Sequence, residues 1–199
     1  LASFSGHSQA VTAVALGPKD GQVISAGLDG TIRLWQTAPE PVTFKDRQGE
    51  VTAVAYTTDG SRLAIALPAD KRAAILIRDV ATGRVLQELL GHQEAVTALA
   101  FNHAGNRLVS GSQDKTLRVW DLVDAKFAEI TSLEHPGPLT AVAFNKEGSQ
   151  AFGASSDNAI HQWNLADQSE LRVLSGHTGA ISSLVLAGDL LISGAADNS

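Results

Sequence analysis

A spaced pattern of histidine, aspartate and tryptophan recurs along the chain and limits the possible folds more than any other feature. His7, His92 and His177 each follow a glycine and lie 85 residues apart. Half of that interval, about 42 residues, is a typical length for one blade of a repeat protein. An aspartate lies 22 residues and a tryptophan 28 residues after a histidine in three copies: His7, Asp29 and Trp35; His92, Asp114 and Trp120; His135, Asp157 and Trp163. This self-similarity predicts one structural unit that is copied several times.

Each copy contains short apolar runs separated by turn-forming residues. The first run recurs as AVTAVAL at 10–16 and as AVTALAF at 95–101. These runs are too short for typical helices, rich in β-branched residues and apolar on both faces, so they predict buried strands. Three more strands follow in each copy, and the last is the most polar. The pattern predicts an all-β fold, a β-propeller of four-stranded antiparallel blades with its outer strands in solvent.

The chain resembles the WD-repeat β-propeller family in three features. Gly-His precedes the first strand, an aspartate lies in the turn before the third strand, and Trp120-Asp121 ends that strand. The second copy lacks both the histidine and the tryptophan, so we expect it to pack less regularly. The resemblance implies that the histidine, a second-strand serine, the aspartate and the tryptophan form a hydrogen-bond network in each blade. The implied network residues are His7, Ser25, Asp29 and Trp35; His92, Ser110, Asp114 and Trp120; and His135, Asp157 and Trp163, with Gly153 in the serine position.

The repeat divides residues 1–199, one domain, into about four and a half blades. We expect an outer strand of a closing blade at 1–6, blades at 7–46, 47–90, 91–133 and 134–175, and a partial blade at 176–199. Seven blades of about 42 residues need roughly 300 residues, so the chain is expected to be part of a longer, seven-bladed ring. The alternative is a swapped ring in which two chains complement each other.

Serine, histidine and aspartate together can form a hydrolase triad. Here the set recurs in at least two copies, whereas an active site is normally built once, so we expect no catalytic residues. The chain has no cysteine, which excludes thiolate metal sites and a cysteine nucleophile. His103 and His161 are isolated, and we interpret His161 as repeat drift. The glycines lie at hairpin turns rather than in a phosphate loop, so we expect no metal and no cofactor.

Charge and hydropathy limit the partners. The net charge is -6, and Lys and Arg do not cluster, which is a poor match to nucleic acid or to an anionic membrane. No apolar run approaches the roughly 20 residues that span a bilayer. We therefore expect a soluble protein with protein partners, no nucleic acid and no membrane insertion. Further blades or domains of the same longer chain are alternative partners. The lack of cysteine favours the cytoplasm slightly, without fixing the compartment.

Alternating strand directions place two kinds of loop at one end of every blade: the loop before the first strand and the turn between the second and third strands. Loops on a rigid scaffold are the usual place for recognition. The candidate partner-binding residues at this end are Gln9, Leu28, Glu94, Gln113 and Ser156, with Lys71 and Arg72 from an insertion of about three residues in the second copy. The insertion is equally compatible with a tolerated extension of a degenerate blade.

These features predict a non-catalytic scaffold for protein-protein interactions. One alternative is a regulatory or structural module of a larger multidomain protein. The other is a hydrolase or a cofactor-binding propeller, which would need unique polar residues along the central channel. The sequence places only small first-strand residues there: Thr12, Thr52, Thr97 and Thr140.

Overall fold

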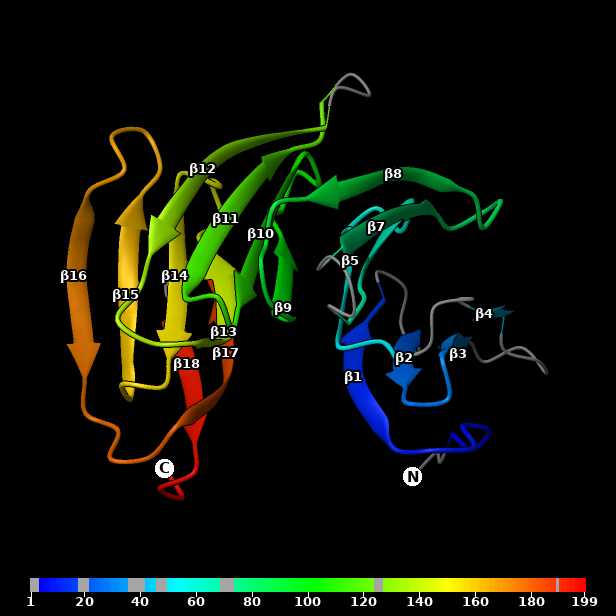
Figure 1. Cartoon of the computed structure of the whole chain (residues 1–199), viewed down its shortest axis with the longest axis horizontal. Coiled ribbons are helices and arrows are strands. Elements are labelled where there is room, and N and C mark those ends of the chain that lie inside the picture. Colours follow the sequence, from blue (N-terminus) through cyan, green and yellow to red (C-terminus); the bar gives the residue numbers. More distant parts are fainter. Residues whose placement is uncertain are drawn as a thin grey trace.

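The short apolar runs form β-strands, and successive groups of four strands make antiparallel sheets (Figure 1). The structure is a computed structural model that describes residues 4–17, 22–35, 42–45, 50–68, 74–123, 127–188 and 190–199. Within these ranges every regular element is a strand, which confirms the all-β prediction. The same ranges contain no helix long and apolar enough to cross a membrane.

In each sheet the strands lie side by side in the order in which they occur in the sequence. The first two sheets are β1 (Val11–Leu16), β2 (Val23–Gly27), β3 (Thr31–Trp35) and β4 (Val42–Lys45), then β5 (Ala53–Tyr56), β6 (Arg62–Ala66), β7 (Ala74–Asp79) and β8 (Val85–Leu90). The third and fourth are β9 (Val96–Phe101), β10 (Arg107–Ser112), β11 (Thr116–Asp121) and β12 (Ala128–Glu134), then β13 (Leu139–Phe144), β14 (Gln150–Ser155), β15 (Ala159–Asn164) and β16 (Glu170–Ser175). The fifth sheet, as described, pairs β17 (Ile181–Ala187) with β18 (Leu190–Ala195).

The hydrophobic core lies between neighbouring sheets. Ile75 and Ile77 of β7, for example, pack in one cluster with Leu108 and Trp120 of the third sheet. Three similar clusters lie between the other neighbouring pairs of sheets. The three inner sheets bury both of their faces against neighbours, and the sheets follow one another around an axis as the blades of a β-propeller do.

The arc of described sheets does not close into a ring. Its end sheets leave apolar side chains exposed, including Leu16 of β1 at 81% and Leu190 of β18 at 63%. Residues 4–6 form no strand, and residues 1–3 lie outside the described part of the chain. The blade boundaries, the outer strand at 1–6 and the seven-bladed ring therefore stay predictions.

The second sheet is as regular as its neighbours, so the expectation that it packs less regularly was wrong. Its four strands pair in order, and Leu63, Ile65 and Ile75 are almost completely buried. Aliphatic side chains fill this core from both sides. The histidine and tryptophan that this copy lacks are consequently not needed to pack a sheet.

A bulge recurs near the start of the first strand, and two of the bulged threonines bond to the next sheet. The register shifts across Thr12, Thr97 and Thr140. A β-bulge redirects a side chain from the regular ladder. Thr12 Oγ1 donates to the Val51 carbonyl at 2.6 Å, and Thr97 Oγ1 donates to the Leu139 carbonyl at 2.6 Å, each in the next sheet.

Candidate functional site

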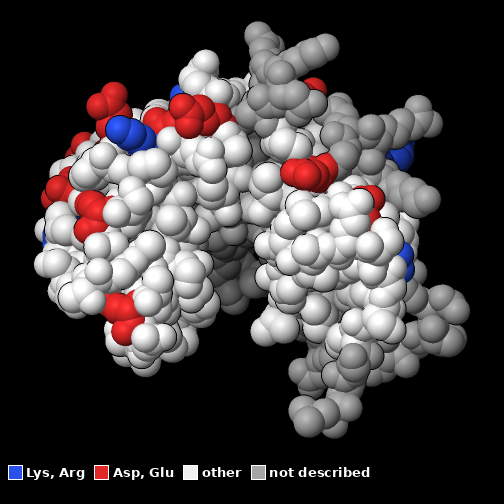
Figure 2. Space-filling model, turned by 60° about the horizontal axis from the view of Figure 1, so that its bottom comes forward, with Lys and Arg blue, Asp and Glu red and all other residues white. Residues whose placement is uncertain are grey.

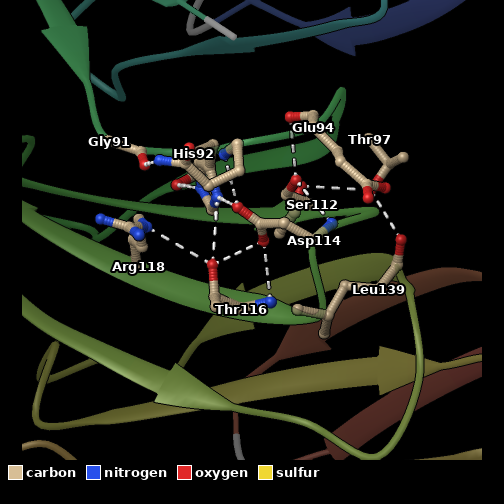
Figure 3. A network of polar contacts seen from close by, with 12 residues as sticks. Gly91, His92, Glu94, Thr97, Ser112, Asp114, Thr116, Arg118 and Leu139 are labelled. Carbon is tan, nitrogen blue, oxygen red and sulfur yellow. Dashed lines mark hydrogen bonds and ion pairs between the residues drawn. The ribbon is translucent and has the colours of Figure 1, made fainter. Parts of the chain in front are cut away.

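The third sheet brings His92, Ser110, Asp114 and Trp120 into one hydrogen-bonded group. Figure 3 shows His92 beside Asp114 and Thr116. His92 Nδ1 lies 2.9 Å from Asp114 Oδ2, and His92 Nε2 lies 2.7 Å from Ser110 Oγ. Trp120 Nε1 donates to the same serine oxygen at 2.9 Å. A carboxylate can only accept, so Nδ1 carries the proton and Nε2 accepts the serine hydroxyl. Each polar atom of the group therefore has a partner.

The ionisation states follow from this geometry. Burial by itself would raise the pKa of Asp114, but hydrogen bonds from Thr116, from the Gln93 backbone and from His92 outweigh it and lower the pKa to about 2. Burial lowers the pKa of His92, although Asp114 opposes this shift. At neutral pH the pair is therefore a carboxylate beside a neutral imidazole.

The first sheet repeats the arrangement. His7 Nδ1 lies 3.1 Å from Asp29 Oδ1, and His7 Nε2 lies 2.7 Å from Ser25 Oγ. Trp35 Nε1 donates to Ser25 Oγ at 2.7 Å. Hydrogen bonds from Thr31, the Ser8 backbone and His7 outweigh burial, which acts in the opposite direction, and hold the pKa of Asp29 well below its usual range.

Sequence reasoning missed two parts of these groups. A threonine two residues after the aspartate donates to the carboxylate, from Thr31 at 2.7 Å and from Thr116 at 2.6 Å. The fifth sheet also holds a histidine group, with His177 2.8 Å from Ser193 Oγ and 3.1 Å from Asp197 Oδ2. The aspartate lies two residues closer to its histidine here because the hairpin is shorter, which hid it from a search at a fixed offset.

The hydrogen bonds match those of a Ser-His-Asp triad, but the chemistry open to the group differs. Catalysis needs a serine oxygen that a substrate can reach. Ser110 is 0% exposed, and its oxygen already accepts from an indole N–H. The same group recurs in the first and fifth sheets without the features of a unique site. The arrangement holds loops and strands together, and in the first and third sheets its serine is buried away from solvent.

The fourth sheet departs from the network that the resemblance implies. Gly153 offers no hydroxyl, and Trp163 Nε1 donates directly to His135 Nε2 at 3.1 Å. Asp157 accepts instead from Ser155 Oγ at 2.5 Å and pairs with His161 Nε2 at 2.9 Å. The expected grouping of His135 with Asp157 is therefore corrected. His161, interpreted as repeat drift, is buried and bonded to two carboxylates.

The candidate partner-binding residues lie on loops at one end of the sheets. Gln9, Glu94, Gln113 and Ser156 are exposed, and Leu28 is half-buried. Figure 2, where this end comes forward, shows a mainly uncharged surface with separate acidic side chains. Lys71 and Arg72 lie outside the described residues.

The first strands line an open hollow of about 260 Å³. Its polar lining is made of small hydroxyl side chains: Thr12, Thr52, Thr97, Thr140, Ser182 and Ser183. Thr12, Thr52 and Thr97 donate to carbonyls of the next sheet, so their hydroxyls serve the connection between sheets. The described part of the chain contains no cluster of three or more His, Cys, Asp or Glu side chains that could hold a metal ion.

Four-stranded antiparallel sheets in an arc, with a recurring His-Ser-Asp group, define a repeat protein built from β-propeller blades. The family model for "WD domain, G-beta repeat" matches residues 1–36, 83–121, 127–164 and 168–199, more than half of the chain. The chain therefore belongs to the WD40 repeat family, as the sequence resemblance predicted.

Curated relatives share part of this sequence. Saccharomyces cerevisiae U3 small nucleolar RNA-associated protein 21 is 32% identical over 117 residues, which is 58% of this chain and 12% of that protein. Human pre-mRNA-processing factor 17 is 32% identical over 124 residues, 61% of this chain and 21% of that protein. Arabidopsis thaliana periodic tryptophan protein 2 is 31% identical over 135 residues, 62% of this chain and 14% of that protein. The chain thus matches about a fifth or less of the length of these relatives.

The relatives overturn one expectation about partners. Two of them are named for association with a small nucleolar RNA and for processing of pre-mRNA. The exclusion of nucleic acid from the partners, drawn from the net charge of -6, was therefore wrong. Net charge describes direct attraction to phosphates. A subunit of an assembly that contains RNA can instead be held by protein contacts, and overall charge does not detect this.

Proposed function

We propose that the chain is a non-catalytic scaffold that holds proteins together in an assembly containing RNA. The observation that carries this proposal is the recurrence of the His-Ser-Asp group, whose serine is 0% exposed at Ser110. Residues that could have formed an active site are used to fix loops, and recognition is left to the exposed loop residues. The names of the relatives favour partners that process RNA.

The carboxylates of the recurring group hold the loops before the first strands. Asp114 accepts from the Gln93 backbone N–H at 2.9 Å, and Asp29 accepts from the Ser8 backbone N–H at 2.9 Å. Asp197 accepts from the Thr178 N–H at 2.7 Å. A loop that is already ordered loses little conformational entropy when a partner binds. This preorganisation supports the loop end as the binding face.

The second candidate function is a structural or regulatory module within a longer protein. It is favoured by the comparison of lengths, since the chain matches only 12% to 21% of the relatives named for RNA. In that case the partner surface would belong to other parts of the same polypeptide. The relatives also favour a compartment where small nucleolar RNA or pre-mRNA is processed over the cytoplasm.

Affinity purification tests the scaffold proposal. The tagged protein is recovered with and without RNase, and the proteins and RNA that accompany it are identified. Gln113→Arg places a charge at the binding end of the third sheet, and Ala104→Arg places the same charge at the opposite end; both residues are exposed. We expect Gln113→Arg to reduce a set of RNA-processing proteins about tenfold and Ala104→Arg to retain them. Equal recovery with both variants would contradict the assigned face, and a purification without RNA-processing proteins would contradict the assembly.

A further inference from the structure

The fourth sheet replaces a permanent ion pair of the third sheet with a titratable one. In the third sheet, Arg118 Nη1 lies 2.5 Å from Glu129 Oε2. Arg118 pairs with the serine position of β10, and Glu129 lies opposite Trp120. In the fourth sheet, His161 pairs with Gly153, and Glu170 lies opposite Trp163. His161 and Glu170 thus occupy the places of the arginine and its glutamate.

The surroundings of His161 require a charged ring. His161 Nδ1 lies 2.5 Å from Glu170 Oε1, and His161 Nε2 lies 2.9 Å from Asp157 Oδ2. A carboxylate accepts and cannot donate, so each ring nitrogen must carry a proton to bond an ionised partner. The His161 side chain is only 6% exposed, so its two ring nitrogens depend on these carboxylates for partners. The arrangement therefore fits an imidazolium between two carboxylates.

We propose that His161 is a proton-dependent clasp that joins the outer strand β16, through Glu170, to the β14–β15 turn, through Asp157. When the ring loses one proton, one nitrogen becomes an acceptor that faces a carboxylate oxygen, and that connection is lost. The equivalent arginine of the third sheet keeps its charge at any pH that the fold tolerates. At this position the fourth sheet thus has a proton-dependent pair where the third sheet has a permanent one.

His135 is the other titratable group that faces this ring, with the two ring centroids 5.0 Å apart. Its Nε2 accepts from Trp163, so its proton lies on Nδ1, which is buried without a partner. Burial and the positive charge of His161 lower the pKa of His135 to about 4. His135 therefore stays neutral while His161 titrates.

The loss of the serine and the gain of His161 are linked by space. A Cβ at Gly153 would lie 2.7 Å from His135 Cε1 and 2.7 Å from Leu139 Cδ2. His135 occupies this room and bonds Trp163 instead of Asp157. The carboxylate of Asp157 is thereby left for His161. Both departures from the third-sheet pattern together produce the clasp.

The direction of the pH effect follows from the partners of His161. Burial lowers the pKa of the ring, but the hydrogen bonds and charges of Glu170 and Asp157 outweigh it and raise the pKa above 6.5. A group whose pKa rises on folding stabilises the fold fully below its unfolded pKa. That stabilisation is lost as pH rises through the folded pKa. We therefore expect the fourth sheet to weaken as the pH rises above 6.5.

Nuclear magnetic resonance of the histidine rings tests the clasp directly. In protein labelled with ¹⁵N, we expect both nitrogens of His161 to be protonated at pH 6 and the ring to titrate above 6.5. Glu170→Gln removes one carboxylate charge and should move this titration to lower pH. A ring that titrates at or below 6.5, or that holds a single proton at pH 6, would overturn the proposal.

A melting series provides the second test. His161→Arg restores the charge pattern of the third sheet and keeps it at all pH values examined. We expect the melting temperature of the wild type, measured relative to His161→Arg, to fall between pH 6 and pH 9. A difference that does not change with pH would refute a proton-dependent connection. If His161→Arg does not fold, the ring titration of the unmodified protein still decides the question.

Discussion

Replacing Ser110 by alanine tests the structural role of the recurring group in the third sheet. Ser110 Oγ accepts from Trp120 Nε1 at 2.9 Å and donates to His92 Nε2 at 2.7 Å, and the residue is 0% exposed. The substitution leaves an indole N–H and an imidazole nitrogen buried without partners. Each such group costs about 1–3 kcal/mol, so we expect the two together to lower the free energy of unfolding by roughly 2–6 kcal/mol. In a chain of this size that corresponds to a fall of about 4–24 °C in melting temperature.

Circular dichroism during urea and thermal unfolding measures this loss. Ser132→Ala is the matched control, because Ser132 lies on β12 opposite Arg118, in the same sheet, and is exposed. We expect the control to change the free energy of unfolding by less than about 0.5 kcal/mol. If Ser110→Ala behaved like Ser132→Ala, the buried hydrogen bonds would not stabilise the sheet, and the structural interpretation of the group would fail. A catalytic role would gain weight only if activity disappeared while stability did not change.

Three further perturbations examine other contacts. Thr97→Val removes the 2.6 Å bond to the next sheet and should lower the free energy of unfolding in urea by about 1 kcal/mol. Thr140→Val, whose hydroxyl bonds its own sheet at 3.2 Å, should lower it less. Equal losses would contradict a role for the connection between sheets. Gly153→Ser restores the serine of the other sheets, but its Cβ would meet His135 and Leu139, so it should lower the free energy of unfolding by about 1–3 kcal/mol. In Gly176→Ser the new Cβ meets nothing within 4 Å, so this control should be neutral in the same assay. Asp114→Asn should lower the melting temperature at pH 7. The difference from the wild type should shrink as pH falls from about 4 towards the Asp114 pKa of about 2, because protonation removes the stabilisation that the ionised carboxylate provides. A constant difference over that range would show that ionisation of Asp114 is not the cause.

The sequence predicted the strands well because local signals determine them. The run expected at 95–101 forms β9, Val96–Phe101, and turn-forming residues separate it from β10 as the pattern indicates. Periodic apolar residues and turn residues act over a few positions and need no knowledge of the rest of the fold. The second sheet was judged wrongly because the missing His and Trp were given more weight than its aliphatic core.

The contacts between strands were harder to anticipate. A fixed offset from His92 identifies Asp114 because one hairpin of constant length separates them, but the offset fails for His177 and Asp197, where the hairpin is shorter. The bond from Thr97 to the Leu139 carbonyl joins two neighbouring sheets, and no local pattern announced it. The role of His161 depends on what a residue in a neighbouring strand, Gly153, does not provide. Such features arise from register and space between strands, which a single sequence reports only indirectly.

In the third sheet, buried side chains hold the loop backbone and leave neighbouring loop side chains exposed for recognition. In the third sheet the carboxylate of Asp114 accepts from the Gln93 N–H at the start of the loop, while the neighbouring exposed residue Glu94 uses its backbone carbonyl to bond Ser112 at 3.0 Å. The backbone of the loop is thus fixed by buried groups, and the Glu94 side chain is left exposed. Substitutions of such side chains should alter partner choice without lowering stability, since surface changes away from structural contacts are usually small. A repeat family can in this way keep one fold while its binding face changes.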